Sequence, residues 1–596
     1  MPQEIDKTHY ILPLDQPIVY LDANTAFQGL TDQEKLYAYY LRNLKQFKEV
    51  ASNAGFSEDD ITALLVYSAG IFCNAGNYKG FGDSKFIPGI EAPKLEKLLH
   101  LSPVWNQIEP LWEMCKDAIY DLSSGKTSSA NCGEIEMEEF NGATYSLTNG
   151  DYSPLMEGLV QYLQKAVPYA ANDIQVNMLK AYIESFTTGS LQKHKEGSRF
   201  WIQDKIPAIE TYIGFIETYR DPAGIRAEFE GFVAAVNRPM SSKFATLVEN
   251  AEELLHLLPW PRGFEKDTFL RPDFTSLDVL TFSGSGIPAG INIPNYDDIR
   301  QTEGFKNVSL GNVIPASYQQ SVIPFLNNTD IQLLQKYRVM AFEVQKGANG
   351  SLNYSSTLLD PLTGEPPVSY YEAGDTYDSC FGPISSAYEE CRAEAVGLYL
   401  SVESNVLSIF GHNGTDADDI VYVNWLSLAW AGLCSLEMWD PNRGWLQAHS
   451  QARFALTRVL IEAGVVNILQ STPQDLLLSI DRTSIKGAGR NAIGHFLLKL
   501  QIYKSTANIS AAKKLFQKYT DVTNQWISWR DIVLANKRPR KMFTQPNMIL
   551  NKQVELKPYE ASPEGLIQSW VERFDEPELL HEALLMLSKK DAHFFI

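Results

Sequence analysis

Apolar residues recur with helical spacing along most of the chain. Four such amphipathic stretches are 153–170, 242–260, 389–411 and 445–464. A further stretch, 30–55, begins at Thr31, where Glu34 follows three residues later as in a capping box. Recurrence at intervals of three and four residues is typical of helices that bury one face. The sequence therefore predicts a mostly helical protein.

Two parts of the chain depart from this pattern. The segment 275–315 has short β-branched runs separated by Gly and Pro, and a similar stretch begins near Phe543. Such runs indicate strands and turns, so we expect a small β unit assembled from separated segments. The most apolar run, 422–439, contains Asn424 and Glu437 and is slightly short for a bilayer. We interpret it as a buried core helix rather than a membrane span.

Composition narrows the class of protein. The 596 residues carry a net charge of −21, and 44% of them are hydrophobic, which is typical of a folded globular chain. The acidic balance argues against a nucleic-acid partner and against adhesion to an anionic membrane. The first 22 residues lack a basic region followed by an apolar core, and the six cysteines are scattered without a CxxC pair. We therefore expect a cytoplasmic protein with reduced thiols.

Several longer strings are specific enough to indicate a family. They include NYKGFGDSKFIP (77–88), GSRFWIQDKIP (197–207), GFIETYRDPAGIRAEFEGFVA (214–234), YEECRAEAVGLYL (388–400) and QAHSQARF (447–454). Together they resemble the dipeptidyl peptidase III family, cytosolic zinc exopeptidases that remove dipeptides from peptide N-termini. The resemblance implies an α+β fold of two lobes around a wide cleft. It assigns 1–237, 276–321 and 540–596 to a lower lobe with a small β-barrel, and 238–275 and 322–539 to a helical upper lobe.

The zinc site of the family is incomplete in this sequence. Family members bind the metal through a His-Glu-Leu-Leu-Gly-His helix and a glutamate from a later Glu-Glu-Cys-Arg-Ala-Glu helix. The second helix is present here at 389–394, but no histidine occurs between His256 and His412. Either 342–347 is a degenerate motif with Glu343 in the glutamate position, or the motif is deleted. Both alternatives remove the two imidazoles, so we expect no bound metal, no cofactor and no normal zinc peptidase activity.

The resemblance also implies which residues contact a peptide. Glu217 and Tyr219 match positions that hold the substrate's N-terminus and backbone, while Asn292 and Asn295 match amides that bind its amine. A carboxylate and two amide oxygens can accept all the protons of an ammonium group. The alternative is that Asn-Ile-Pro-Asn is turn chemistry alone.

A strand next to this receptor is expected to pair with the peptide. Pro288 and Ala289 match a strand onto which family members add the bound peptide, although a strand that simply needs small residues is an equal explanation.

Further polar residues match the family's catalytic and supporting positions. The resemblance assigns His449 to oxyanion stabilisation, Arg453 and Arg540 (with Lys541 beside it) to the substrate site, and Asp378 and Glu394 to support of the metal ligands. Without the metal, Glu389 and Glu390 would crowd these carboxylates, and like charges raise one another's pKa. The cluster could then act as a general acid or base, or it could be an inert remnant neutralised by Arg392 or water.

Two hypotheses from different classes follow. The first is a pseudopeptidase that binds a peptide in the cleft between the lobes without cutting it. The second is a metal-independent enzyme that reuses the cleft for isomerisation, cyclisation or elimination of a small metabolite. Residual peptidase activity is a third. We expect the protein to be a monomer or a homodimer.

Overall fold

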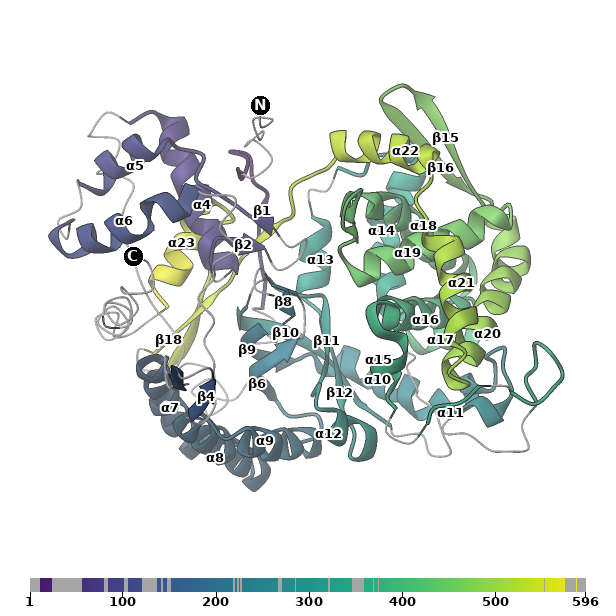
Figure 1. Ribbon diagram of the computed structural model, residues 1–596, viewed down its shortest axis with the longest axis horizontal. Helices are drawn as coiled ribbons and strands as arrows, with labels where there is room; N and C mark the ends of the chain where they lie inside the picture. Colours follow the sequence, from purple (N-terminus) through teal and green to yellow (C-terminus); the bar gives the residue numbers. More distant parts are fainter. Residues whose placement is uncertain are drawn as a thin grey trace. The chain divides into compact units, whose positions relative to one another are not determined.

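The computed structural model divides the chain into two units (Figure 1). Unit 1 comprises Met1–Ser241, Pro272–Gln319 and Pro539–Ile596, and unit 2 comprises Ser242–Arg271 and Gln320–Arg538. The described residues are 11–23, 56–74, 76–79, 84–100, 105–120, 137–140, 143–146, 152–217, 220–221, 224–225, 228–265, 271–284, 286–319, 322–345, 359–367, 369–372, 375–550, 553–573 and 586. At Glu217 and Asp378 only the backbone is described.

A five-stranded mixed sheet forms the centre of unit 1. It contains β6 (Ile209–Glu217), β9 (Glu228–Val236), β10 (Asp273–Ser283), β11 (Gly290–Ile293) and β12 (Lys306–Leu310). Their order is β11-β12-β10-β9-β6, and only the β10–β12 pair is parallel. This half-barrel confirms the β unit predicted for 275–315. The sheet already begins at Asp273 in β10, three residues before the lobe boundary expected from sequence.

Helices pack their apolar faces against this sheet. They are α7 (Ser153–Ala166), α8 (Asp173–Thr188) and α9 (Leu191–Gln203), which follow one another along the lower part of unit 1 in Figure 1. Tyr182 and Trp201 from these helices pack with Tyr212 and Phe232 of the sheet in one buried cluster. Because this cluster fixes β6 against α8 and α9, it provides a rigid base for the residues at the end of β6 and around β11.

Distant parts of the chain complete unit 1. Strand β1 (Ile18–Tyr20) pairs in parallel with β17 (Met542–Thr544), and β18 (Asn547–Leu550) forms a hairpin with β19 (Val554–Lys557). The side chain of Gln545 accepts from the backbone N–H of Phe282 and donates to its carbonyl, so it joins the C-terminal segment to β10. The strands expected after Phe543 are therefore present in unit 1.

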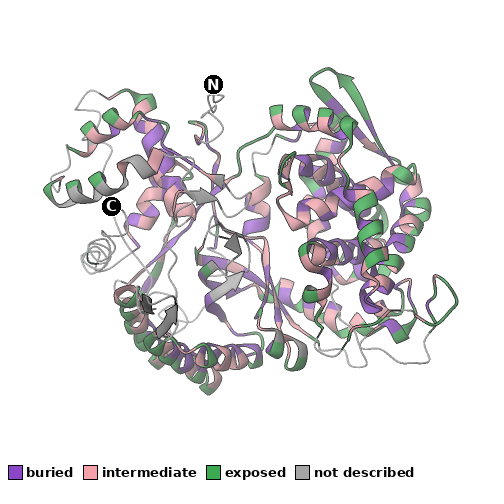
Figure 2. Cartoon of the chain, viewed as in Figure 1, coloured by how far each residue is buried: buried purple, intermediate pink, exposed green. Residues whose placement is uncertain are grey.

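Unit 2 is built mainly from helices. The largest are α14 (Asn328–Gln345), α16 (Ser385–Leu400), α18 (Gly414–Cys434), α19 (Ala448–Glu462), α20 (Arg490–Ser505), α21 (Ile509–Thr520) and α22 (Asn524–Ala535). Helix α18 packs against α14 and α19, and its Trp425 is fully buried. Among the described residues, Gly414–Met438 is long and apolar enough to cross a membrane, but it is mostly enclosed by protein (Figure 2). The prediction of a core helix at 422–439 is confirmed.

Shorter elements connect these parts. In unit 1 they are β2 (Tyr78–Lys79), β3 (Ser84–Lys85), α4 (Glu58–Asn74), α5 (Ala92–Leu99), α6 (Trp105–Tyr120), β4 (Met137–Phe140), β5 (Ala143–Ser146), η2 (Val167–Tyr169), β7 (Arg220–Asp221), β8 (Gly224–Ile225), α12 (Asp297–Thr302), α13 (Val313–Tyr318) and α23 (Pro563–Val571). Helix α10 (Arg238–Glu249) leads from unit 1 into unit 2. In unit 2 they are α11 (Ala251–Leu255), η3 (Arg262–Phe264), α15 (Tyr377–Phe381), η4 (Gly382–Ile384), α17 (Ser404–Ile409), η5 (Ser435–Met438), β13 (Trp439–Asp440), β14 (Gly444–Trp445), η6 (Arg482–Ser484) and η7 (Ile485–Gly489).

Most helices expected from periodicity are present, with local differences. The stretch 389–411 contains two helices, α16 and α17, separated at 401–403. The hairpin of β15 (Val466–Thr472) and β16 (Asp475–Ile480) was not anticipated, although its apolar runs flank a Pro-containing turn. The expected helix at 30–55 and the expected loop at 123–133 lie outside the described residues.

Candidate functional site

A cluster of ionisable side chains lies between α16 and α19 in unit 2. Helix α16 presents Glu390 and Glu394, which are four residues apart and therefore share a face. Helix α19 presents His449 and Arg453 at the same spacing. The structure thus brings together four of the residues that the sequence singled out.

Glu389 points to a different set of partners from Glu390. Its carboxylate accepts hydrogen bonds from Arg392 Nε at 3.1 Å and from Lys504 Nζ at 2.5 Å. Burial alone would raise the pKa of Glu389, but the charges of Arg392 and Lys504 outweigh burial and hold that pKa far below its usual value. Glu389 is therefore an ionised structural anchor. Lys504 was missed from sequence because it reaches the cluster from α20, more than 100 residues away.

Glu394 is held by a guanidinium and an imidazole. Arg453 Nε lies 2.9 Å from each carboxylate oxygen, and His449 Nδ1 lies 3.2 Å from Oε1. Burial alone would raise the pKa of Glu394. Arg453 and His449 outweigh burial and hold this pKa below its usual value, so the carboxylate is ionised at neutral pH. This carboxylate has both oxygens engaged by a permanent cation.

Glu390 and His449 form a second facing pair in this cluster. His449 Nδ1 lies 3.3 Å from Glu390 Oε2, and about a third of each side chain is exposed. Burial, together with Glu394 and Glu389, raises the pKa of Glu390 despite the opposing charge of His449. Burial lowers the pKa of His449, but the hydrogen bond with Glu394 and the charge of Glu390 raise it above its usual value. Two facing groups with raised pKa values can relay a proton.

The donor set around Glu390 does not fit zinc. Zinc sites in proteins usually have three or more side-chain ligands of thiolate, imidazole or carboxylate character. Glu394 is covered by Arg453, and Glu389 is covered by Arg392 and Lys504. Within the part of the chain that the structure describes, no group of three His, Cys, Asp or Glu side chains could hold a metal ion.

Glu343, the residue in the glutamate position of the degenerate-motif alignment, lies on α14. Burial raises the pKa of Glu343 to about 7, and the charge of Lys243 on α10 opposes this shift. Lys243 itself donates to the carbonyl of Phe410. The carboxylate of Glu343 therefore responds to a charge outside the Glu390 cluster, which gives no support to a role beside Glu390.

Asn292 and Asn295, the two amides expected to bind a peptide amine, lie in one segment of unit 1. Strand β11, with Asn292 at its third position, is an edge strand of the described sheet and pairs on one side only, with β12. Oδ1 of Asn292 is buried and accepts no hydrogen bond from any described residue. The backbone carbonyl of Asn292 is engaged separately, by Arg300 Nη1 at 3.1 Å. An unsatisfied buried acceptor is destabilising, and a donor from a ligand would relieve it.

The segment around β11 is fixed on both sides. Pro288 and Ala289 precede the strand, and the carbonyl of Ala289 accepts from the N–H of Leu310. Asn295 is exposed and follows Pro294, whose peptide bond with Ile293 is cis. The predicted segment therefore has an open strand edge followed by an amide-bearing turn.

His194 supports this turn and was missed by the sequence argument. Its Nε2 donates to the carbonyl of Ile213 in β6 at 2.8 Å, and its Nδ1 accepts from the hydroxyl of Tyr296 at 2.8 Å. Burial lowers the pKa of His194, which keeps the imidazole neutral and suits one donated and one accepted bond. The histidine thus links the strand that ends at Glu217 to the residue after Asn295. No local motif marks this contact, because its three parts are distant in sequence.

The structure describes the remaining predicted site residues only in part. Tyr219 and the side chains of Glu217 and Asp378 lie outside the described residues. The side chain of Arg540 is exposed at the beginning of the last segment of unit 1, and its carbonyl accepts from Gln16 Nε2. Lys541 beside it is partly buried.

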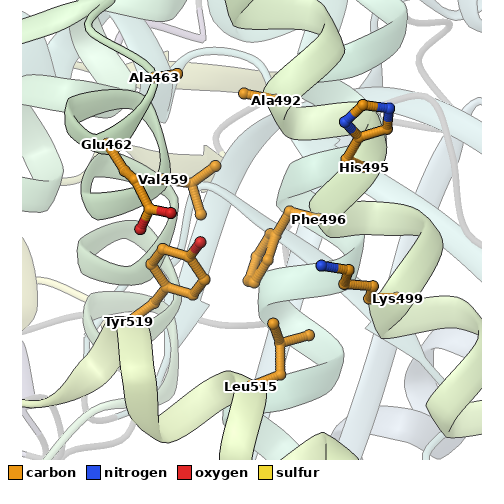
Figure 3. A pocket seen from close by; sticks show the side chains of 9 residues that line it. All are labelled: Val459, Glu462, Ala463, Ala492, His495, Phe496, Lys499, Leu515 and Tyr519. Carbon is orange, nitrogen blue, oxygen red and sulfur yellow. The ribbon is translucent and has the colours of Figure 1, made fainter.

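A separate cavity of about 270 Å³ lies among α19, α20 and α21 (Figure 3). Glu462, His495, Lys499 and Tyr519 line it around the apolar side chains of Val459, Ala463, Ala492, Phe496 and Leu515. None of the residues predicted from the sequence lines this cavity. Val459 follows Arg453 on α19 by six residues, about 9 Å along the helix axis.

Comparisons with known proteins agree with the fold. The sequence profile of peptidase family M49 matches residues 114–574. The chain belongs to this family, the dipeptidyl peptidase III family. Dipeptidyl peptidase 3 from Homo sapiens is 41% identical over 99% of this chain and 98% of its own length. The protein of that name from Dictyostelium discoideum is 38% identical over 97% of this chain and all of its own length.

The alignment with the human relative also shows a difference in length. It extends over 724 positions, although this chain has 596 residues. Because both proteins are covered almost from end to end, the human protein has internal residues that this chain lacks.

Solved structures support the fold. The structure of DPP III from Caldithrix abyssi covers 85% of this chain and 90% of its own with a TM-score of 0.54 at 18% identity. The dipeptidyl-peptidase III from Corallococcus sp. strain EGB covers 87% of this chain and 93% of its own with the same TM-score at 17% identity. They share the two-lobed α+β fold predicted from the sequence.

Proposed function

We propose that this chain is a dipeptidyl peptidase III homologue without catalytic zinc, which binds peptides by their free N-terminal amine and does not hydrolyse them. The observation that carries the proposal is the buried Oδ1 of Asn292, which has no donor among the described residues and lies on an edge strand. A peptide amine is a donor of suitable charge and size for this acceptor. The free edge of β11 offers backbone groups for the peptide that follows the amine.

The absence of hydrolysis follows from the chemistry of unit 2. The Glu-Glu-Cys-Arg-Ala-Glu helix is kept, but no histidine occurs between His256 and His412. The alignment with the human relative is longer than this chain, and we propose that the motif lies among the internal residues that this chain lacks. Glu389 and Glu394 are already paired with cations, which leaves Glu390 as the one carboxylate of this helix free to ligate. Without zinc the chain has no Lewis acid to activate water, so a bound peptide would stay intact.

The cysteines and charge suggest where such a protein would act. Cys73, Cys380, Cys391 and Cys434 are free thiols among the described residues. Free thiols that are partly or, at Cys391, fully buried suit a reducing compartment, so we propose that the protein is cytoplasmic. Its ligand would be a peptide or a protein N-terminus with an unmodified amine.

One observation favours a second candidate function. Glu390 and His449 face each other, and the pKa of each is raised. A protonated imidazole could donate a proton while an ionised carboxylate accepts one, which is what isomerisation or elimination of a small metabolite needs. In this alternative Glu390 is the base and His449 is the acid, with Glu394 positioning the imidazole.

Calorimetry with matched peptides tests the proposal. A short peptide with a free N-terminus should bind, and acetylation of that N-terminus should weaken binding by about tenfold to a hundredfold, since a hydrogen bond to a charged group contributes roughly 1.5–3 kcal/mol. Asn292→Ala should weaken binding of the free peptide but leave the acetylated peptide unchanged. Glu217→Gln should act like acetylation, and the two changes should not add.

The control variant is Asn250→Ala, which removes an amide just after α10 that donates to the backbone carbonyl of Thr246. Binding should be unaffected by this change. If no peptide binds at millimolar concentration, or if acetylation makes no difference, the peptide-binding proposal is wrong. The Glu390–His449 pair would then be the place to test small-molecule chemistry.

A further inference from the structure

A two-stranded hairpin extends from the helices of unit 2 (Figure 1). Strand β15 pairs with β16 in the register Val466 to Ile480 and Leu469 to Leu477. One face of the hairpin is buried through Ile468, Leu476 and Leu478, whose side chains are 8% exposed or less. The other face is largely exposed (Figure 2). The hairpin is therefore firmly attached on one side and accessible on the other.

The two edges of the hairpin differ. The outer edge of β16 is partly covered, because the N–H of Leu478 donates to the carbonyl of Phe325 at 2.8 Å and α22 packs nearby. The carbonyl of Gln474 in the turn accepts from Asn536 Nδ2 of the same region. No described residue other than those of β16 forms a backbone hydrogen bond with Val466–Thr472. Within the described part of the chain, the outer edge of β15 is thus an unpaired strand edge.

Strand β15 lacks the side chains that usually protect such an edge. Natural proteins place Lys, other charges or Pro on exposed edge strands to prevent pairing. The sequence of β15, VNILQST, has neither a charged residue nor a proline. Leu469 is 55% exposed, and its cross-strand partner Leu477 is 36% exposed. The register of the hairpin shifts between Gln470 and Thr472, which affects only the tip of β15. Residues 466–470 keep a regular strand geometry and can still pair with another strand.

Charge indicates which occupant suits this edge. The chain has a net charge of −21, so most contacts between two copies would bring carboxylates together. Two β15 edges related by a twofold axis would instead run antiparallel and place uncharged side chains opposite one another. Leu469 of one copy would then lie near Leu469 of the other and extend the exposed leucine pair into an apolar stripe.

We propose that the outer edge of β15 pairs with the same edge of a second copy of this chain, forming a homodimer through a four-stranded antiparallel sheet. The contact is isologous, since each copy contributes the same strand. It rests on the hairpin of unit 2 alone and is independent of the peptide-binding proposal. Because five residues from each strand make a small interface, the dimer is weak and forms at high protein concentration.

Sedimentation equilibrium of the full chain tests this. Between about 1 µM and 300 µM, the range of weak interfaces, the average mass should rise from the monomer value of 67.0 kDa toward twice that value. Leu469→Lys should raise the dissociation constant by at least about tenfold, because two like charges would then lie close together at the twofold axis. Leu469→Glu should do the same. Mixing the Lys and Glu variants should restore dimers.

The matched control is Leu191→Lys, which places the same charge on an equally exposed leucine of α9. This variant should dimerise as the unmodified chain does, and circular dichroism should show all variants folded. A constant mass of 67.0 kDa over the whole range would overturn the proposal. Dimerisation that ignores both Leu469 substitutions would show that another surface is used and would equally overturn it.

Discussion

Nδ1 of His449 lies 3.3 Å from Oε2 of Glu390, while the neighbouring Glu389 and Glu394 are paired with Arg392 and Arg453. The retained glutamate of the Glu-Glu-Cys-Arg-Ala-Glu helix thus contacts an imidazole of α19. Glu390 is therefore the carboxylate of this helix whose charged partner, His449, can itself lose a proton. Its protonation behaviour is therefore the most direct readout of the state of the site.

The first prediction concerns this titration. His449 should titrate above the usual value of about 6.5 in the folded protein, as seen by NMR of labelled histidine, with His449→Gln to assign the signal. Because the folded pKa of His449 is raised, the protonated imidazole contributes stability that is fully present below pH 6.5 and is lost as pH rises through the folded value. Glu390→Gln should lower the pKa of His449. An unchanged pKa in that variant would show that Glu390 does not face the imidazole in solution.

Zinc content is the second prediction. Purified protein should carry less than about one tenth of a zinc per chain, because Glu390 and His449 alone fall short of the three protein ligands that zinc sites use. Elemental analysis after brief dialysis against a chelator measures this directly. Added zinc or cobalt should not release dipeptides from an arylamide substrate. Near-stoichiometric zinc that survives dialysis would contradict the proposed loss of the metal site.

The third prediction concerns the anchoring role of Glu389. Glu389→Gln should lower the free energy of unfolding at pH 7 by about 1–3 kcal/mol, because Arg392 stays buried without its counter-charge. Urea unfolding measures the change. The pKa of Glu389 is depressed, so the stabilisation is complete above the unfolded value near 4.3 and declines as pH falls below it. The difference between the two proteins should therefore shrink in acid.

Two further variants check that assignment. Lys504→Met combined with Glu389→Gln should be less destabilising than the sum of the single changes, since both remove one interaction. Glu462→Gln breaks the exposed pair with Lys518 and should alter stability by less than about 1 kcal/mol. Equal effects of Glu389→Gln and Glu462→Gln would argue against a buried anchor.

Glu343 gives a prediction of opposite sign. Burial raises its pKa to about 7, so the folded state binds its proton more tightly than the unfolded state. This carboxyl group therefore makes the protein less stable as pH rises from about 4.5 to 7. Glu343→Gln should increase the free energy of unfolding at pH 8 and flatten its pH dependence, while zinc content and peptide binding stay unchanged. A loss of peptide binding would instead restore Glu343 as a candidate site residue.

The sequence predicted those parts of the structure that local patterns determine. The strands of 275–315 and the core helix containing Trp425 follow from periodicity and from Gly and Pro positions. The shared face of His449 and Arg453 follows from helical spacing. The partners of these side chains could not be predicted in this way. Lys504 meets Glu389 across 115 residues, and Tyr296 meets His194 across 102 residues. Such contacts depend on tertiary packing, which single-sequence patterns do not record.

The hairpin shows a further limit of pattern recognition. Its strands contain consecutive leucines, as in DLLLSI, and a continuous apolar run suits a buried helix as well as a strand. Only the alternation of burial along β15, from Val466 through Ile468, shows that it is a two-sided strand.

The parallel pairing of β1 with β17 has a consequence for how the protein is made. The ribosome produces Ile18–Tyr20 first and their partners Met542–Thr544 only near the end of synthesis, while all of Ser242–Arg271 and Gln320–Arg538 lies between them. The helical unit can therefore be complete before the N-terminal strand has anything to pair with. A chain released before residue 542 would contain a finished unit 2 attached to an unfinished unit 1. Completion of unit 1 thus depends on translation passing Thr544.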